Sequence, residues 1–175
     1  IGQTTDLDAI LGAADSPLKT TIEAAKLNAG PLFTAYVIPL YTGGYDDWYT
    51  AIETALEVPH DLTPESVWLT DPVVNADIAN MQAACTAAEN VYAKYITIHA
   101  PTAAIDNATQ TWDEWITATK AINNGEVAPR VHLIPQTHEH NLGVILGRLV
   151  NENISIADSP CLLYTSDAAD DWFCV

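Results

Sequence analysis

The chain has 175 residues, 49% of them hydrophobic, and carries 23 acidic but only 6 basic side chains, for a formal net charge of −17. This length is typical of one domain, which can bury enough surface to fold without disulfides or a metal. The acidic balance argues against nucleic acid and anionic membranes as partners, because few cations are present to neutralise phosphate groups. No apolar run approaches the roughly 20 residues of a membrane-spanning helix.

The first part of the chain is predicted to be irregular before Ser16 and helical after it. Ser16 is a favourable N-cap residue, Pro17 suits the first helical turn, and Gly30 suits the end of a helix. An apolar run at residues 35–40 predicts the first strand. Apolar residues spaced three and four apart then predict a helix at residues 45–57.

Strands and helices alternate through the rest of the chain. Strand-like runs recur about every 30 residues, which is the length of a βαβ unit. Thr111 and Glu114 form a predicted capping box, and Gly125 suits a left-handed C-cap. The further predicted strands are residues 66–70, 95–99, 130–134 and, as a fifth, 153–157, and the further predicted helices are residues 76–93, 111–124 and 141–150.

This alternation predicts an α/β fold with a mostly parallel sheet of about four or five strands, flanked by helices on both faces. Three parts are predicted: an N-terminal segment with one helix at residues 1–34, an α/β core domain at 35–160 and a tail at 161–175. The tail is expected to be non-native, because Cys-Leu-Leu-Tyr-Thr-Ser-Asp-Ala-Ala-Asp at residues 161–170 resembles translated sequencing adapter from metagenomic assemblies. The core domain is therefore expected to be truncated at its C-terminal end.

Sequence motifs for phosphate binding and nucleophilic catalysis are missing from the chain. No Gly-x-Gly-x-x-Gly or Gly-Lys-Ser/Thr loop occurs, and Gly43-Gly44 is interpreted as a turn. No Gly-x-Ser-x-Gly elbow is present. Cys85, Cys161 and Cys174 have neither metal-binding nor disulfide-framework spacing, and Cys85 is predicted to be a core residue. No catalytic residue, metal or cofactor is therefore predicted.

An enzyme or ligand-binding domain is the alternative, because ligands of open parallel sheets bind beyond the carboxyl ends of the strands. In this alternative Asp71 and His138 are a conceivable acid–base pair. A metal cluster of His132, His138, Glu139 and His140 has poor spacing for a segment that is predicted to be a loop entering a helix. The residues expected at the strand ends are Thr70, Asp71, His99, Gln136, His138 and His140.

The last predicted helix carries two glycines and a basic residue. Gly143 and Gly147 lie four residues apart, and this spacing is expected to let the helix lie close to the sheet or to a neighbouring subunit. Arg148 is interpreted as a salt-bridge residue rather than a ligand anchor.

Three segments carry a resemblance to a known family. They are Ile-Leu-Gly-Ala-Ala-Asp-Ser-Pro-Leu-Lys at residues 10–19 with Leu-Asn-Ala-Gly at 27–30, Tyr-Val-Ile-Pro-Leu at 36–40 with Trp48, and residues 141–151 with 154–160. Together they resemble DUF2586, a bacterial and phage family that is similar to the tail sheath proteins of contractile, Mu-like phages. The resemblance covers roughly residues 1–160.

The resemblance implies a structural subunit of a phage or prophage tail sheath. Its partners would be copies of itself in a helical or ring assembly and the tail tube protein, with neither nucleic acid nor membrane. Such a subunit needs no catalyst or cofactor, belongs to the virion tail and is assembled in the bacterial cytoplasm. A different interaction or scaffold protein on the same fold is a further alternative.

Overall fold

The computed structural model describes residues 1–38, 40, 48–138 and 140–151. The chain forms two compact units: unit 1 contains Ile1–Tyr36 and the chain from His140 onward, and unit 2 contains Val37–Glu139. Unit 1 is therefore discontinuous in the sequence. The domain division drawn from the sequence stays a prediction, because its tail lies outside the described residues.

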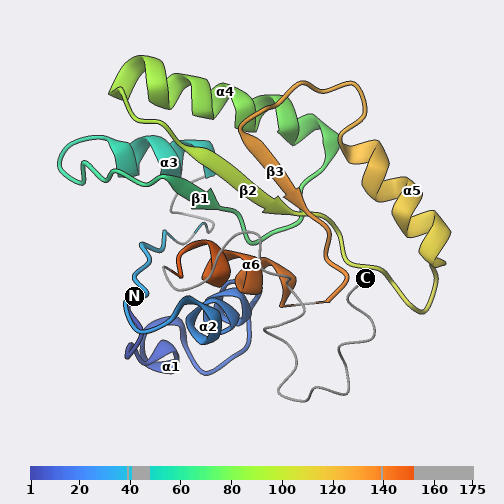
Figure 1. Ribbon diagram of the computed structural model, residues 1–175, viewed down its shortest axis with the longest axis horizontal. Helices are drawn as coiled ribbons and strands as arrows, with labels where there is room; N and C mark the ends of the chain where they lie inside the picture. The colour runs from blue at the N-terminus through green and yellow to red at the C-terminus, as the bar shows by residue number, and fades with distance from the viewer. Residues whose placement is uncertain (39, 41–47, 139, 152–175) are drawn as a thin grey trace. The chain divides into compact units, whose positions relative to one another are not determined.

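Unit 1 begins with a short helix, α1 (Leu7–Leu11), shown in Figure 1. The Asp6 carboxylate caps it by accepting hydrogen bonds from the amides of Asp8 and Ala9, at 3.0 and 3.3 Å. Gly12 ends it with φ +88°. The prediction of irregular structure before Ser16 is wrong here, because a helix of one turn is too short to show a helical period.

Unit 1 also contains two longer helices among its described residues, and both were predicted, the first of them from its end residues. α2 (Pro17–Ala29) starts at Ser16, whose Oγ accepts the Lys19 amide at 3.2 Å, and ends at Gly30, with φ +77°. α6 (Asn141–Leu149) follows unit 2 in the sequence. The side chain of Asn151, just after α6, donates a hydrogen bond to the carbonyl of Asn28 at 2.8 Å.

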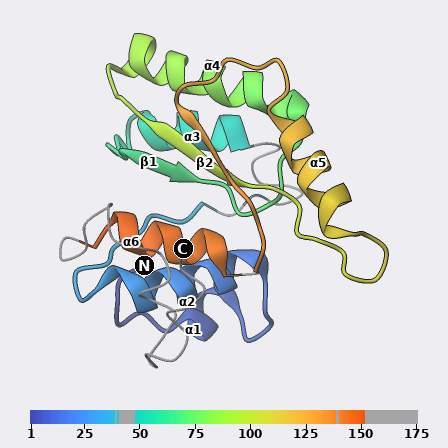
Figure 2. The same ribbon diagram turned by 45° about the vertical axis from the view of Figure 1, so that its right-hand side comes forward.

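α2 and α6 pack closely side by side (Figures 1 and 2). A Cβ atom at Gly143 would overlap the Thr21 carbonyl oxygen and would lie 2.7 Å from the Cβ of Ala24. A Cβ atom at Gly147 would lie 2.5 Å from the Ala25 carbonyl oxygen. The two glycines thus face α2. The expectation that they face the sheet or a neighbouring subunit is wrong, because small residues on both helices let these two main chains approach each other.

Unit 2 contains a parallel sheet, which confirms the α/β class. Among the described residues the sheet has three strands in the order β1-β2-β3, so the predicted four or five strands are not found there. The strands are β1 (Ser66–Trp68), β2 (Thr97–Pro101) and β3 (Val131–Ile134), and the helices are α3 (Trp48–Leu56), α4 (Asn75–Tyr92) and α5 (Trp112–Ile122). The predicted capping box of α5 is present, with the Thr111 amide donating to Glu114 at 2.8 Å.

The first predicted strand, residues 35–40, is not formed over residues 35–38. Instead, the Ala35 amide donates to the Ile1 carbonyl at 2.8 Å, and the Ile1 ammonium group donates to the Ala35 carbonyl at 2.9 Å. Residues 35–38 have a high β-propensity, but Ala35 pairs with the start of the chain instead of forming a strand with its neighbours. Tyr36 is 75% exposed. The fifth predicted strand lies outside the described residues.

The core of unit 2 lies on one face of the sheet, along which α4 runs (Figure 1). Strand residues that are paired in register, such as Val67, Ile98 and Val131, face buried residues of α3 and α4. Ile122 of α5 packs against the same core. Helices were expected on both faces. The strand order β1-β2-β3 follows the chain without reversing. Right-handed crossovers between strands in such an order place their helices on the same face of the sheet, and helices on the second face require the strand order to reverse.

Candidate functional site

On the face of the sheet opposite the core, three rings form a stacked row with one ring from each strand. Trp68 is paired in register with His99, and His99 with His132. The ring centroids of Trp68 and His99 lie 4.2 Å apart, and those of His99 and His132 lie 4.8 Å apart. Alternate residues of a strand point to opposite faces, so this aromatic row (Trp68, His99 and His132) follows directly from the register.

The central ring of the aromatic row has an unusual electrostatic environment. His99 is 8% exposed. Burial, followed by the neighbouring His132, lowers the pKa of His99 to about 4, so its imidazole is neutral at pH 7. The Oγ1 of Thr97 lies 3.4 Å from Nε2 of His99. A neutral imidazole stacked between two other rings is better suited to a packing role for His99 than to acid–base chemistry.

The aromatic row does not provide a metal site. The planes of the His99 and His132 rings differ by only 20°. Nitrogen lone pairs lie in the ring plane, so those of two nearly parallel rings point side by side rather than toward one ion. In the part of the chain that the structure describes, no group of three or more His, Cys, Asp or Glu side chains could hold a metal ion.

The residues that were expected at the strand ends are not all found there, and the conceivable acid–base pair among them is not formed. His99 lies in the middle of β2 rather than at its end, so its predicted place is wrong. Asp71 and His138 are both exposed and make no hydrogen bond or ion pair with each other. His140 stands at the N-terminal end of α6, two residues after His138. His132, one member of the metal cluster considered for the enzyme alternative, stacks against His99 within the sheet.

The other strand-end residues are half-buried. Thr70 follows β1, and the Oε1 atom of Gln136 is buried without a hydrogen-bond partner among the described residues. Glu139 lies outside the described residues. Arg148 is half-buried on α6, and its role in a salt bridge stays a prediction.

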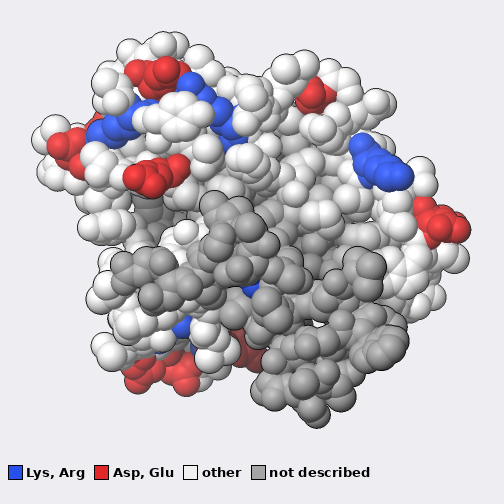
Figure 3. All heavy atoms as spheres, in the orientation of Figure 1, with Lys and Arg blue, Asp and Glu red and all other residues white. Residues whose placement is uncertain are grey.

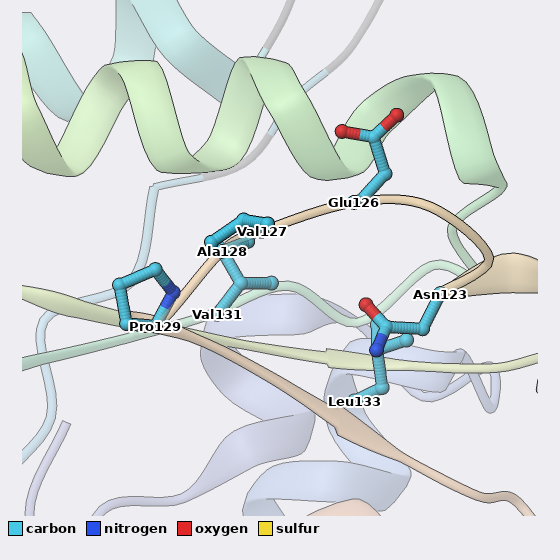
Figure 4. A pocket seen from close by; sticks show the side chains of 7 residues that line it. All are labelled: Asn123, Glu126, Val127, Ala128, Pro129, Val131 and Leu133. Carbon is cyan, nitrogen blue, oxygen red and sulfur yellow. The ribbon is translucent and has the colours of Figure 1, made fainter.

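An open hollow of about 450 Å³ lies beside β3, as Figure 4 shows. Its lining is mostly apolar, and the carboxylate of Glu126 points away from the neighbouring Val127. Val127 is 88% exposed. The hollow adjoins the start of β3, not the carboxyl ends of the strands where ligands of parallel sheets bind. The lining residues are Asn123, Glu126, Val127, Ala128, Pro129, Val131 and Leu133.

Sequence reasoning did not single out this surface. Its only signal was the short apolar run from Val127 to Pro129 after Gly125, which is ordinary for a loop. Among the described residues the outer edges of β1 and β3 have no partner strand. Such edges carry unpaired main-chain groups that another strand can meet.

Comparison with known proteins agrees with the resemblance drawn from the sequence. A family model described as DUF2586, N-terminal domain, matches residues 1–165. The chain belongs to the DUF2586 family. The match runs past Pro160 into the adapter-like segment, so the non-native origin of that segment stays a prediction.

One curated relative of this DUF2586 chain is a candidate tail sheath protein of Haemophilus phage HP1 (strain HP1c1). The two are 26% identical over 170 residues, covering 91% of this chain and 43% of the relative. The chain therefore spans less than half the length of that relative. No solved structure matches the chain. Among the described residues of this DUF2586 chain, no helix is both long and apolar enough to cross a bilayer.

Proposed function

We propose that this chain is part of the structural subunit of a contractile phage tail sheath. The observation that carries the proposal is the similarity to a candidate phage tail sheath protein along 91% of the chain. In this proposal copies of the subunit assemble around a tail tube. The protein is made in the bacterial cytoplasm and ends in the virion tail.

The described geometry fits a structural role better than a catalytic one. A catalytic site needs a nucleophile, a base or a metal held within hydrogen-bond reach of its partners. Here Asp71 and His138 make no hydrogen bond or ion pair with each other, and the buried His99 is held between two other rings. No observation favours the enzyme or ligand-binding alternative, and we do not propose it.

A sheath subunit must contact copies of itself by two different surfaces. Such heterologous contacts build an open helical assembly, whereas a self-complementary surface closes a dimer. The described sheet offers two different outer edges, that of β1 and that of β3, and the apolar hollow adjoins the second. These features give an assembling subunit distinct surfaces, although the proposal does not depend on which of them is used.

Co-assembly with a tail tube tests this function. The full-length protein that carries this chain is expressed with the tail tube protein of the same phage, and the particles are purified by sedimentation. We expect both proteins in one sedimenting fraction, with the chain forming an outer layer in electron micrographs. Recovery of tubes without the chain, in repeated preparations at high and low salt, would contradict the proposal.

A further inference from the structure

Most basic side chains of the molecule are occupied within the chain itself. Lys19 pairs with Asp8 at 2.5 Å, Lys94 pairs with Asp61 at 2.6 Å, and Arg130 pairs with Glu89. The paired basic side chains are only 5%, 13% and 16% exposed. The ammonium group of Lys26 donates a hydrogen bond to the Thr5 carbonyl at 2.7 Å. Four of the 6 basic residues are thus committed to groups of their own chain.

The acidic side chains are far more numerous than these pairs can neutralise. The chain has 23 acidic residues, and the excess remains large without Asp167, Asp170 and Asp171 of the predicted tail. Asp71 and Asp113, for example, are exposed, and Glu126 is half-buried. On the face shown in Figure 3, basic groups occur only as small areas, and no broad basic surface is seen among the described residues. Among the described residues, exposed acidic side chains therefore far outnumber exposed basic ones.

We infer that association between copies of this chain is gated by ionic strength, and that cations in solution must screen the copies before they can join. The inference rests on the proposed function. Unit charges of equal sign repel over a distance set by the Debye length, which is about 30 Å at 0.01 M salt and about 3 Å at 1 M. Copies of like net charge therefore repel more strongly, and from farther apart, at low salt than at high salt.

The attraction between copies must come from groups other than ion pairs. Apolar side chains and sheet edges supply it, and excluded salts strengthen apolar burial. Salt should therefore promote assembly of this protein. Complexes held by ion pairs behave in the opposite way, because salt weakens their contacts. The direction of the salt effect separates the two cases.

Sedimentation velocity of the full-length protein at one concentration tests the inference, with NaCl varied from about 10 mM to about 1 M. We expect a shift from monomer to larger species as salt rises. The variant D71N/D113N/E126Q removes three carboxylates, two of them on exposed residues, and should shift the transition to lower salt. Lys120→Glu, at an exposed position of α5, adds one acidic group in place of a basic one and should shift it to higher salt.

The outcomes separate this inference from the proposed function. Assembly that is equally strong at every salt concentration, or that weakens as salt rises, overturns the inference and leaves the sheath role standing. Unchanged transitions in both charge variants also overturn it. A protein that stays monomeric at every salt concentration contradicts the proposed function, and the inference falls with it.

Discussion

Gly143 of α6 meets the main chain of Thr21 in α2 with no room for a side chain between them. The contact joins the two segments of unit 1, which are far apart in the sequence. Small residues at such positions set the distance between two helices, because any added atom must push a main chain away.

Gly143→Ala gives a test in which two effects have opposite signs. In an exposed helix this change would stabilise by about 1 kcal/mol through helix propensity. In this structure the new methyl group overlaps the Thr21 carbonyl, so we expect the free energy of unfolding to fall by about 1–3 kcal/mol. Urea unfolding followed by circular dichroism measures the change. A gain in stability would show that α6 does not pack against α2 in this way.

His99 makes stability depend on pH in a definite window. Its folded pKa is about 4 and its ordinary value is 6.5, so the unfolded chain binds the proton more readily. The contribution of the neutral ring is complete above pH 6.5 and is lost as the pH falls from there toward 4. The loss amounts to at most about 3 kcal/mol.

His99→Phe keeps a flat ring in the aromatic row and removes the titration. Urea unfolding of the wild type and of H99F at pH 7.5 and pH 4.5 isolates the contribution of His99, since the carboxylates titrate in both proteins. We expect the wild type to lose more stability than the variant between these two values. Equal losses would mean that His99 is not buried beside His132.

Lys19 connects α2 to α1 and to the loop that follows it. Its ammonium group pairs with Asp8 and donates hydrogen bonds to the carbonyls of Gly12 and Ala13, at 3.4 and 3.3 Å. The hydrogen bond that the Lys19 ammonium group donates to the Asp8 carboxylate is the main cause that raises the pKa of Lys19 above 10.5. This contribution is therefore present below about pH 10.5 and is lost only as the pH rises through the higher folded value.

Lys19→Met should release α1, because methionine keeps much of the length of the side chain but cannot bind Asp8. We expect faster amide hydrogen exchange in residues 7–12 and a lower melting temperature, while exchange in α4 stays as in the wild type. Lys19→Arg, which keeps the charge, is the matched control and should lie between the two. Unchanged exchange in residues 7–12 of the methionine variant would contradict the role of Lys19.

Trp115 fastens α5 to the loop after β2. It is 6% exposed, and its Nε1 donates a hydrogen bond to the Ala103 carbonyl at 2.8 Å. Trp115→Phe should cost about 1–3 kcal/mol of stability, because the hydrogen bond is lost and a carbonyl is left without its partner. Trp112→Phe is the control: its ring is 53% exposed, and the change should stay within about 0.5 kcal/mol. Urea unfolding measures the free energy of unfolding of both variants. Equal losses of stability would mean that the hydrogen bond of Trp115 does not anchor α5.

Sequence reasoning predicted the helices with end signals well. Ser16 and Pro17 mark the start of α2, and the box of Thr111 and Glu114 marks the start of α5. These signals act between residues a few positions apart, so the local sequence contains them. α1 was missed because it is a helix of five residues.

Tertiary pairing explains what the sequence did not reveal. Residues 35–40 have the composition of a strand, but Ala35 pairs with Ile1 instead. The aromatic row depends on the register of three strands, and register is decided by packing between residues that are far apart in the sequence. The spacing of Gly143 and Gly147 indicated a close contact, but it could not identify α2 as the partner.

Negative-stain electron microscopy of the full-length protein that carries this chain tests the central claim most directly. The protein is imaged across a range of protein concentrations and at low and high salt. A sheath subunit predicts hollow tubes or stacked rings of uniform diameter, most abundant at high salt. Particles that remain monomeric under every condition would contradict the assignment to a tail sheath.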